Sequence, residues 1–388
     1  MKNVKRAMGR DKDVKLIAMY FPQFHAIAEN CKWWGTGFTD WNNVRASRPQ
    51  FAGHYQPRVP LDANYYDQSR LETLRWQVNL AKQYGIYGFC HYHYWFDGKQ
   101  MLETPTNLWL ENKDIDFPFC LSWANETWSR RWDGRDHHIL IQQTHPPMKE
   151  SWKKHFDYLI KLWADPRAIT VEGKPVFAIY RPHRIDQIDQ MIDYWRELAQ
   201  QLGLPGLYIV AQKQYEFPTR DCIRSFDGAF QFQPFEAIYS PGFDQGSIRH
   251  TAAFKLIQRL PERIQDMLRG LRSMFVKELT FYDYETVWNQ IIQIRHEEEL
   301  DTYPGAFVDW DNAPRYKNRA TVFHGAMPET FKKWFGRLVE TMPDRALPEN
   351  YIFLNAWNEW SEGAYLEPDD RYEYSYLEAI EQVIKKGQ

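Results

Sequence analysis

Residues Tyr351–Asp370 read YIFLNAWNEWSEGAYLEPDD. The apolar run at the start of this stretch has the length and composition of a strand that is buried on both faces. Glu359 and Glu362 follow, three residues apart, among tryptophans and amides. An ionised carboxylate is costly to bury unless it is paired, so acids just beyond a buried strand indicate chemistry. We predict that Glu359 and Glu362 are a catalytic pair, and the alternative is a solvated loop with charges at its tip.

Seven further strand-like runs precede this one, and helical patterns separate several of them. Strands and helices in alternation are typical of parallel βαβ units, and eight units predict closure into a single (β/α)₈ TIM barrel whose C-terminal-face loops are decorated. No glycine-rich phosphate loop occurs where a strand meets a helix, which counts against a nucleotide-binding open sheet. The predicted strands are Lys15–Phe21, Ile86–Trp95, Phe117–Trp123, Pro175–Tyr180, Leu207–Ala211, Gly228–Phe232, Ala306–Trp310 and Tyr351–Leu354. The predicted helices are Asp67–Tyr84, Met101–Leu110, Lys149–Trp163, Ile185–Leu202 and Tyr376–Lys385.

Two segments lie outside this barrel pattern. Residues 1–14 are basic and no apolar run follows them, so we expect a solvated tail before a barrel domain at 15–388, and not a secretory signal. Residues 239–282 exceed an ordinary connection and carry apolar residues at helical spacing with arginines between them. We expect a helical insertion that packs on the barrel as a lid. The alternative is a weak association with a membrane surface through its basic face.

The composition of the chain limits the classes of partner that we expect it to bind. The net charge of −3 gives no reason to expect a nucleic-acid partner. Aromatic residues make up 16% of the chain, with 17 tryptophans and 23 tyrosines, and their crowding into polar segments favours stacking on sugar rings. No apolar run approaches the ~20 residues that span a bilayer, so we expect no transmembrane segment and a cytoplasmic location. The substrate predicted by this composition is an oligo- or polysaccharide.

Active sites of TIM barrels lie at the carboxyl ends of the strands, and polar and aromatic side chains gather there in nearly every predicted unit. Beside the two glutamates, we predict that a set of these side chains binds substrate, although core packing is the alternative for each. The set is His25, Trp41, His91, Tyr92, His93, Tyr94, Asn125, Glu126, Trp128, Tyr180, Asp309, Asp311, Asn358 and Trp360.

Other chemistries fit these residues less well. A metal site would use His91 and His93 with Asp309 or Asp311, but these histidines alternate with tyrosines and serve equally as donors to sugar hydroxyls. The four cysteines show no CxxC spacing, and no GxSxG motif is present. We therefore expect neither a metal nor a cofactor. Two carboxylates among aromatics and amides favour glycoside chemistry, in which one acid protonates the leaving oxygen while the other is a base or nucleophile.

Several motifs together carry a family resemblance. They are Tyr20-Phe21-Pro22-Gln23-Phe24-His25, Gly37-Phe38-Thr39-Asp40-Trp41, Gly88 to Phe96 (GFCHYHYWF), Trp123-Ala124-Asn125-Glu126 and Asn358-Glu359-Trp360-Ser361-Glu362-Gly363 with Glu367-Pro368. This set resembles the WbsX family of bacterial polysaccharide-locus proteins, long labelled glycosyltransferases. It is also similar to glycoside hydrolase family 99, whose members are endo-α-mannosidases and mannanases.

The resemblance implies a metal-independent barrel enzyme that acts on an α-linked mannose- or rhamnose-type glycan of bacterial surface polysaccharide with retention of configuration. Glu359 would deprotonate the substrate's own 2-hydroxyl, giving a 1,2-anhydro sugar, and Glu362 would be the general acid and base. Ser361 stands where those hydrolases have histidine. Two alternatives stay open. In the first, Glu126 and Glu359 form the retaining pair. If they do not, we expect Glu126 to bind a sugar hydroxyl or to pair with Arg130 or Arg131. The chain could also be a glycosyltransferase in O-antigen or lipopolysaccharide biosynthesis.

Overall fold

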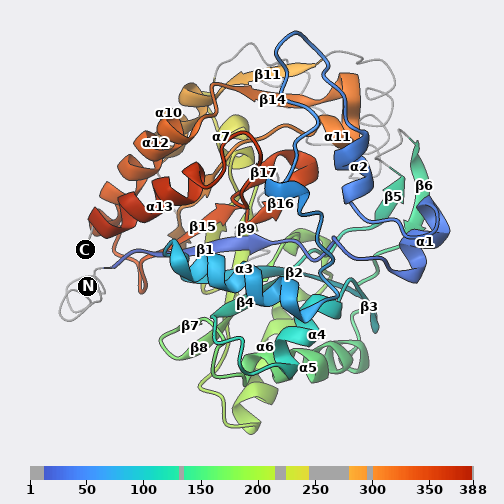
Figure 1. Cartoon of the computed structure of the whole chain (residues 1–388). Helices are drawn as coiled ribbons and strands as arrows, with labels where there is room; N and C mark the ends of the chain where they lie inside the picture. The colour runs from blue at the N-terminus through green and yellow to red at the C-terminus, as the bar shows by residue number, and fades with distance from the viewer. Residues whose placement is uncertain (1–12, 131–134, 215–223, 244–278, 295–299, 387–388) are drawn as a thin grey trace.

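The structure is a computed structural model, and it describes residues 13–130, 135–214, 224–243, 279–294 and 300–386. Its central sheet runs in the order β12–β10–β9–β8–β4–β2–β1–β15–β13, with parallel pairing throughout. β12 and β13 follow one another in the chain and are separated only by Pro304, so they are two halves of one strand. The first half pairs with β10 and the second with β15, which closes the sheet into a (β/α)₈ barrel (Figure 1).

Seven of the eight barrel strands agree closely with the predicted runs, whereas the seventh begins at Asp301 and shares only Ala306 and Phe307 with the predicted run Ala306–Trp310. Their bounds are β1 (Lys15–Tyr20), β2 (Gly88–Phe96), β4 (Phe119–Trp123), β8 (Lys174–Ile179), β9 (Tyr208–Lys213), β10 (Gly228–Gln231), β12 (Asp301–Tyr303), β13 (Gly305–Phe307) and β15 (Tyr351–Asn355). Every residue of β15 is buried, as expected for an apolar run with helices outside it and the barrel core inside. The fold prediction is therefore confirmed.

Gly305 marks the position where the seventh strand changes partners. A Cβ at this residue would lie 1.9 Å from the carbonyl oxygen of Gln231, the last residue of β10. No side chain can be accommodated at that distance, so the close approach of the two strands requires glycine here. The amide of Gly305 also donates a 3.2 Å hydrogen bond to the side chain of Gln231.

Helices surround the barrel, and α13 lies on the side away from α1, α2, β5 and β6 (Figure 1). The helices are α1 (Ala28–Trp34), α2 (Trp41–Ala46), α3 (Leu71–Gln83), α4 (Thr104–Glu111), α5 (Lys149–Trp163), α6 (Ile188–Gln201), α7 (Phe235–Tyr239), α10 (Tyr284–Gln293), α11 (Ala313–Tyr316), α12 (Pro328–Glu340) and α13 (Ser375–Lys386). The short strands are β3 (Lys99–Met101), β5 (Trp128–Arg130), β6 (Arg135–Ile141), β7 (Thr170–Val171), β11 (Thr280–Asp283), β14 (Thr321–His324), β16 (Asn358–Glu359) and β17 (Ala364–Tyr365).

The predicted helices are present with small changes of boundary, and α5 has the predicted bounds. The sequence analysis did not predict α10 or α12, nor the helices α1 and α2 within the long connection after β1. Most of the expected insertion at 239–282 and nearly all of the expected tail at 1–14 lie outside the described residues. None of the described helices combines the length and apolar composition needed to cross a bilayer.

Candidate active site

The stretch after β15 forms a tight hairpin at the carboxyl end of the barrel. β16 and β17 pair antiparallel, with Glu359 opposite Ala364, and Glu362 lies in the turn between them. Gly363 completes the turn with φ of +69°, a conformation that favours glycine. The hairpin therefore places both predicted catalytic carboxylates above the same barrel mouth.

A pocket of about 440 Å³ opens over this hairpin. Its floor holds Gln23, Asp40, Arg315, Glu359 and Glu362, and its sides come from loops that follow different strands. The remaining lining includes Phe21, Asn30, Trp33, Trp34, Phe38, Tyr92, Tyr94, Glu126, Trp128, Tyr180, Arg181, Gln214, Phe235, Trp310 and Tyr316. Mostly aromatic walls with a few convergent polar groups are typical of a small-molecule or sugar site.

Arg315, from α11, lies between the carboxylates of the floor. Its Nη2 is 3.1 Å from Glu359 Oε1, and its Nη1 is 2.8 Å from Glu362 Oε1. The same Nη2 is 2.8 Å from Asp40 Oδ2. Gln23 Nε2 donates to both oxygens of Glu359, at 3.1 and 3.0 Å. One buried guanidinium thus holds three acids that come from widely separated parts of the chain.

Burial raises the pKa of Glu359 well above its usual value, and burial also raises the pKa of Glu362. Arg315 opposes the increase at both residues, whereas Asp40 adds to it because like charges in one site disfavour full ionisation. The side chain of Glu359 is 1% exposed and that of Glu362 is 19% exposed. A site of this kind can hold one ionised and one protonated carboxyl group near neutral pH, which is what acid–base chemistry requires.

Aromatic rings form the wall of the pocket beyond the charged floor. Trp128 in β5 packs edge-on against Trp33 and Tyr94, with ring centroids 6.2 and 5.1 Å apart. Glu126 and Arg181 supply polar groups to the same pocket, and they form an ion pair in which Glu126 Oε1 is 2.7 Å from Arg181 Nε. Arg181 was not among the partners that the sequence suggested for Glu126, and of those two Arg131 lies outside the described residues. The wall offers apolar faces for sugar rings beside groups that can bond hydroxyls.

The pocket brings together part of the predicted site. Glu359, Glu362, Tyr92, Tyr94, Glu126, Trp128 and Tyr180 line it, whereas His25, Trp41, His91, His93, Asn125, Asp309, Asp311, Asn358 and Trp360 do not. Asn125 supports the wall from behind, since its side chain bonds the backbone N–H and C=O of Arg181. The residues outside the lining thus include some that position the site.

The predicted histidines are buried, His91 and His93 in β2 and His25 in the connection after β1. His91 Nδ1 lies 3.2 Å from the hydroxyl of Thr106, and His93 Nε2 lies 2.9 Å from Nε2 of His155. Burial lowers the pKa of His91 and of His93 to about 3, and that of His25 to about 4. Neither His91 nor His93 meets Asp309 or Asp311. Among the residues that the structure describes, no cluster of three or more His, Cys, Asp or Glu side chains is arranged to hold a metal ion.

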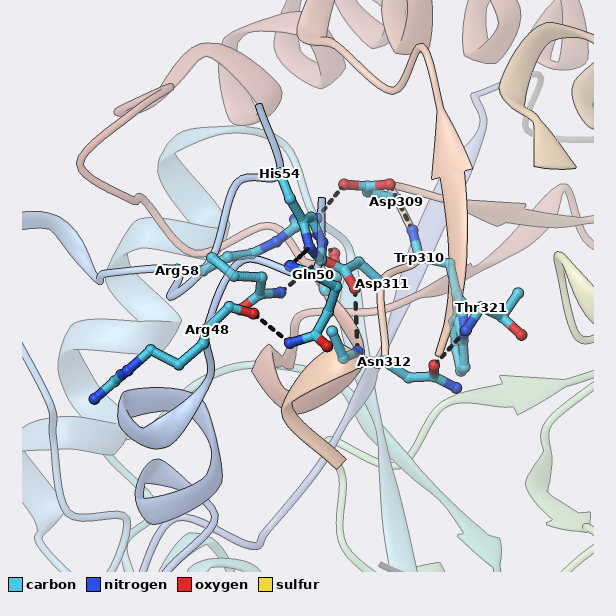
Figure 2. Close-up of polar contacts among 12 residues, drawn as sticks. Arg48, Gln50, His54, Arg58, Asp309, Trp310, Asp311, Asn312 and Thr321 are labelled. Carbon is cyan, nitrogen blue, oxygen red and sulfur yellow. Dashed lines mark hydrogen bonds and ion pairs between the residues drawn. The ribbon is translucent and has the colours of Figure 1, made fainter. Parts of the chain in front are cut away.

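Asp309 and Asp311 belong to a separate ion cluster with Arg58 and His54 (Figure 2). Arg58 Nη2 is 2.7 Å from Asp309 Oδ2, and His54 Nε2 is 2.8 Å from Asp311 Oδ2. The cluster also touches the turn: the amide of Asp311 donates to the carbonyl of Glu362 at 2.7 Å, and Arg58 donates to that of Gly363 at 3.3 Å. These aspartates therefore fix the turn and do not face the pocket.

Beneath the hairpin, Trp41 and Trp360 form an aromatic support with a buried acid. The ring of Trp360 stacks on Tyr365 at 3.8 Å and tilts against Trp41 at 5.4 Å. Glu367 accepts hydrogen bonds of 2.7 Å from Trp360 Nε1, the Tyr66 hydroxyl and Gln77 Nε2. Burial raises the pKa of Glu367 to about 7. This layer holds the hairpin in place from below.

Sequence reasoning missed three residues of the floor. Gln23 and Asp40 stand within motifs that carried the family resemblance, so the motifs themselves were a signal. Arg315 stands alone in a polar segment after the seventh strand, and nothing in that segment indicates its three partners. Its role depends on contacts across 275 residues to Asp40 and 44 residues to Glu359.

One of two similar solved structures supports this architecture. A solved structure titled "Glycoside hydrolase-like protein" aligns with a TM-score of 0.57 at 12% identity, covering 97% of this chain and 95% of that one. A GH99 endo-alpha-mannosidase from Bacteroides thetaiotaomicron aligns with a TM-score of 0.49 at 13% identity over 98% of each chain. At 12% identity, the alignment with the first of these two structures is evidence for the fold alone.

Two curated sequences are more similar to this chain than the solved structures are. "Uncharacterized protein WxcX" from two strains of Xanthomonas campestris pv. campestris is 35% identical over 373 residues, 96% of this chain and 50% of the relative. The chain thus spans about half the length of the curated relatives it matches. The family model described as "Glycosyltransferase WbsX" matches residues 16–380, so the chain belongs to the WbsX family.

Proposed function

We propose that this chain is a retaining, metal-independent glycoside hydrolase or transglycosylase, acting on an α-linked mannose- or rhamnose-type glycan in bacterial surface polysaccharide metabolism. The observation that carries the proposal is the pair Glu359 and Glu362, held by one arginine at the floor of an aromatic pocket. The location proposed for this activity is the cytoplasm, with the glycan as the partner.

The proposed reaction has two steps. In the first, Glu359 removes the proton of the substrate's 2-hydroxyl, O2 attacks the anomeric carbon, and Glu362 protonates the departing glycosidic oxygen. The product is a 1,2-anhydro sugar. In the second, Glu362 takes a proton from water or an acceptor hydroxyl as it attacks the anomeric carbon, and Glu359 returns its proton to O2. Two inversions give net retention of configuration, and both glutamates regain their starting protonation states.

The N–H donors around Glu359, which oppose the effect of its burial, support this division of labour. The shielded Glu359 accepts N–H bonds from Gln23 and Arg315, and such donors favour the ionised form that a base requires. Glu362 is the more exposed of the two and faces the pocket, as a group that exchanges protons with leaving group and water should.

The test is release of reducing ends from bacterial polysaccharides that contain α-mannose or α-rhamnose. Purified wild-type protein should release them, and Glu359→Gln and Glu362→Gln should each reduce the rate by more than about 10³-fold while the circular dichroism spectrum is unchanged. Wild-type turnover by either variant would contradict the assignment.

A glycosyltransferase is the second candidate, because the matching family is described as one. It requires an activated sugar donor. Calorimetry with a panel of nucleotide sugars, with and without Mg²⁺, separates the two functions. Tight binding of one nucleotide sugar together with no release of reducing ends would favour the transferase.

A further inference from the structure

Asp40 is a third carboxylate at the floor of the pocket, and it shares its hydrogen-bond donors with Glu359. Arg315 Nη2 lies 2.8 Å from Asp40 Oδ2 and 3.1 Å from Glu359 Oε1. Gln23 Nε2 lies 2.9 Å from Asp40 Oδ2 and 3.0 Å from Glu359 Oε2. Each of these nitrogens carries two hydrogens, so each can serve both acids at once. The two carboxylates therefore face one another across a pair of common donors.

Asp40 also fixes how these donors are oriented. An ionised carboxylate can only accept, so Asp40 holds the nitrogen side of the Gln23 amide toward itself and Glu359. Its second oxygen accepts from Asn43 Nδ2 at 2.8 Å, which keeps the aspartate in place. Asp40 is 3% exposed. It is thus a buried, well-held anion that touches both donors of Glu359.

Charge balance decides where a proton resides in this cluster. If Asp40, Glu359 and Glu362 were all ionised, three negative charges would face the single positive charge of Arg315. Like charges in one buried site resist full ionisation. Asp40 and Glu359 accept the shared N–H bonds, which favour their ionised forms, while Glu362 pairs with the other nitrogen of Arg315. Burial alone favours a proton on Glu359 more strongly than on Glu362. We place the remaining proton on Glu362 because Glu359 accepts N–H bonds from both Gln23 and Arg315, which oppose the effect of that burial.

We propose that Asp40 is a positioning residue whose charge, acting through Gln23 and Arg315, keeps a proton on Glu362 while Glu359 stays ionised. The inference deepens the proposed function and rests on it for its meaning, because it explains how one glutamate is ready as an acid and the other as a base. Asp40 lines the floor of the pocket and acts through the two donors that it shares with Glu359.

Other titratable groups around the cluster leave this balance in place. Tyr94 from β2 faces the acids, and tyrosines are neutral at pH 7. Glu126 and Arg181 form their own ion pair across the pocket. Next to the turn, Arg58, Asp309, Asp311 and His54 form the separate cluster described above, which a substitution at Asp40 leaves intact.

The test follows the proton directly and needs no substrate. Protein labelled with [5-¹³C]glutamate is titrated by ¹³C NMR, and the two carboxyl signals are assigned by their loss in Glu359→Gln and Glu362→Gln. In the wild type, Glu362 should titrate above the ordinary glutamate range. In Asp40→Asn, the Glu362 midpoint should fall by about one pH unit or more, since one negative charge within the cluster has been removed.

Three variants complete the design. Asp40→Glu keeps the charge and should keep a raised Glu362 midpoint. Asp116→Asn removes the same charge from a side chain that is 90% exposed and should leave the Glu362 midpoint unchanged. If Asp40→Asn does not fold, Asp40→Ser removes the same charge with a smaller side chain and carries the same expectation. An unchanged Glu362 midpoint in folded protein without the Asp40 charge would overturn the inference.

Turnover measurements separate this inference from the proposed function. If the inference is right and the function is right, the alkaline limb of the pH–rate profile moves to lower pH in Asp40→Asn together with the NMR midpoint. If reducing ends are never released but the midpoint still moves, the function fails and the inference about the proton stands.

Discussion

The side chain of Asn358 pairs with the backbone of Phe21 as a neighbouring strand would. Its Oδ1 accepts from the Phe21 amide at 2.8 Å, and its Nδ2 donates to the Phe21 carbonyl at 3.0 Å. These bonds join the hairpin that follows the last barrel strand to the end of the first barrel strand. They bring Glu359, the next residue, within reach of Gln23, so the site depends on this connection.

Asn358→Ala should therefore destabilise the protein and impair the site. The buried amide of Phe21 would lose its partner, and an unsatisfied buried donor costs about 1–3 kcal/mol of the free energy of unfolding. Urea unfolding followed by tryptophan fluorescence measures the loss. Asn79→Ala, on the exposed face of α3, is the matched control and should cost nothing, because alanine is the better helix former. Equal stability of Asn358→Ala and wild type would contradict the account.

Gly363 is required by both its conformation and its neighbours. A Cβ there would lie 2.9 Å from the amide nitrogen of Asp311 and 3.1 Å from the guanidinium of Arg58, in a residue with φ of +69°. Gly203 has φ of +85° but open space around it, so Gly203→Ala reports the conformational cost alone, about 1–2 kcal/mol.

Gly363→Ala should cost more than Gly203→Ala by about 1–3 kcal/mol, the range for overpacking, in chemical unfolding. Its turnover should also fall, because the shifted turn carries Glu362, whereas Gly203→Ala should retain wild-type turnover. The account of the turn is wrong if the two substitutions cost the same.

The role of Glu126 decides between two possible retaining pairs, Glu359 with Glu362 and Glu359 with Glu126. It lines the pocket but is held by Arg181 at 2.7 Å, so we expect it to orient substrate and not to react. Glu126→Gln keeps the shape of the side chain and an oxygen for Arg181, and kcat should fall by less than about tenfold. A loss as large as that of Glu359→Gln, with Glu362→Gln still active, would make Glu126 and Glu359 the catalytic pair.

The pH dependence of stability should report Glu367. Because burial raises the pKa of this acid from 4.5 to about 7, the folded state binds its proton more tightly than the unfolded state does. Its contribution to stability is therefore present below pH 4.5 and is lost as the pH rises toward 7. The order of this loss is ~3 kcal/mol.

Glu367→Gln cannot titrate and mimics the protonated acid. The difference in free energy of unfolding between variant and wild type should therefore grow in favour of the variant as the pH rises from 4.5 to 7. Denaturant unfolding at several pH values measures that difference. A difference that is constant across this range would show that the pKa of Glu367 is not raised in the folded protein.

The sequence predicted the barrel well because the signal is local. Runs such as Tyr351–Leu354 are apolar on both faces, which follows from helices outside the sheet and packed side chains inside. Glu359 and Glu362 were predicted because acids beside a buried strand contradict the local pattern. The helix α12 was missed although Phe331, Trp334, Phe335 and Leu338 recur at helical spacing on its buried face.

The rest of the site depends on contacts that a single sequence does not contain. His91 and His93 alternate along β2, and this pattern suggested a common surface, but nearly every residue of β2 is buried on one face or the other. Asp309 and Asp311 follow the seventh strand as site residues do, yet Arg58 and His54 hold them outside the pocket. The importance of Arg315 arises only when Asp40, Glu359 and Glu362 meet around it.

The most direct test of the central claim is a crystal structure of the protein soaked with mannose- or rhamnose-configured iminosugars. These cations mimic the charge that develops at the anomeric centre. The account predicts the ring on the floor of the pocket, flanked by the carboxylates of Glu359 and Glu362, with Trp128 on its far side. An iminosugar bound in this pocket away from both glutamates, or between Glu126 and Glu359 alone, would contradict it.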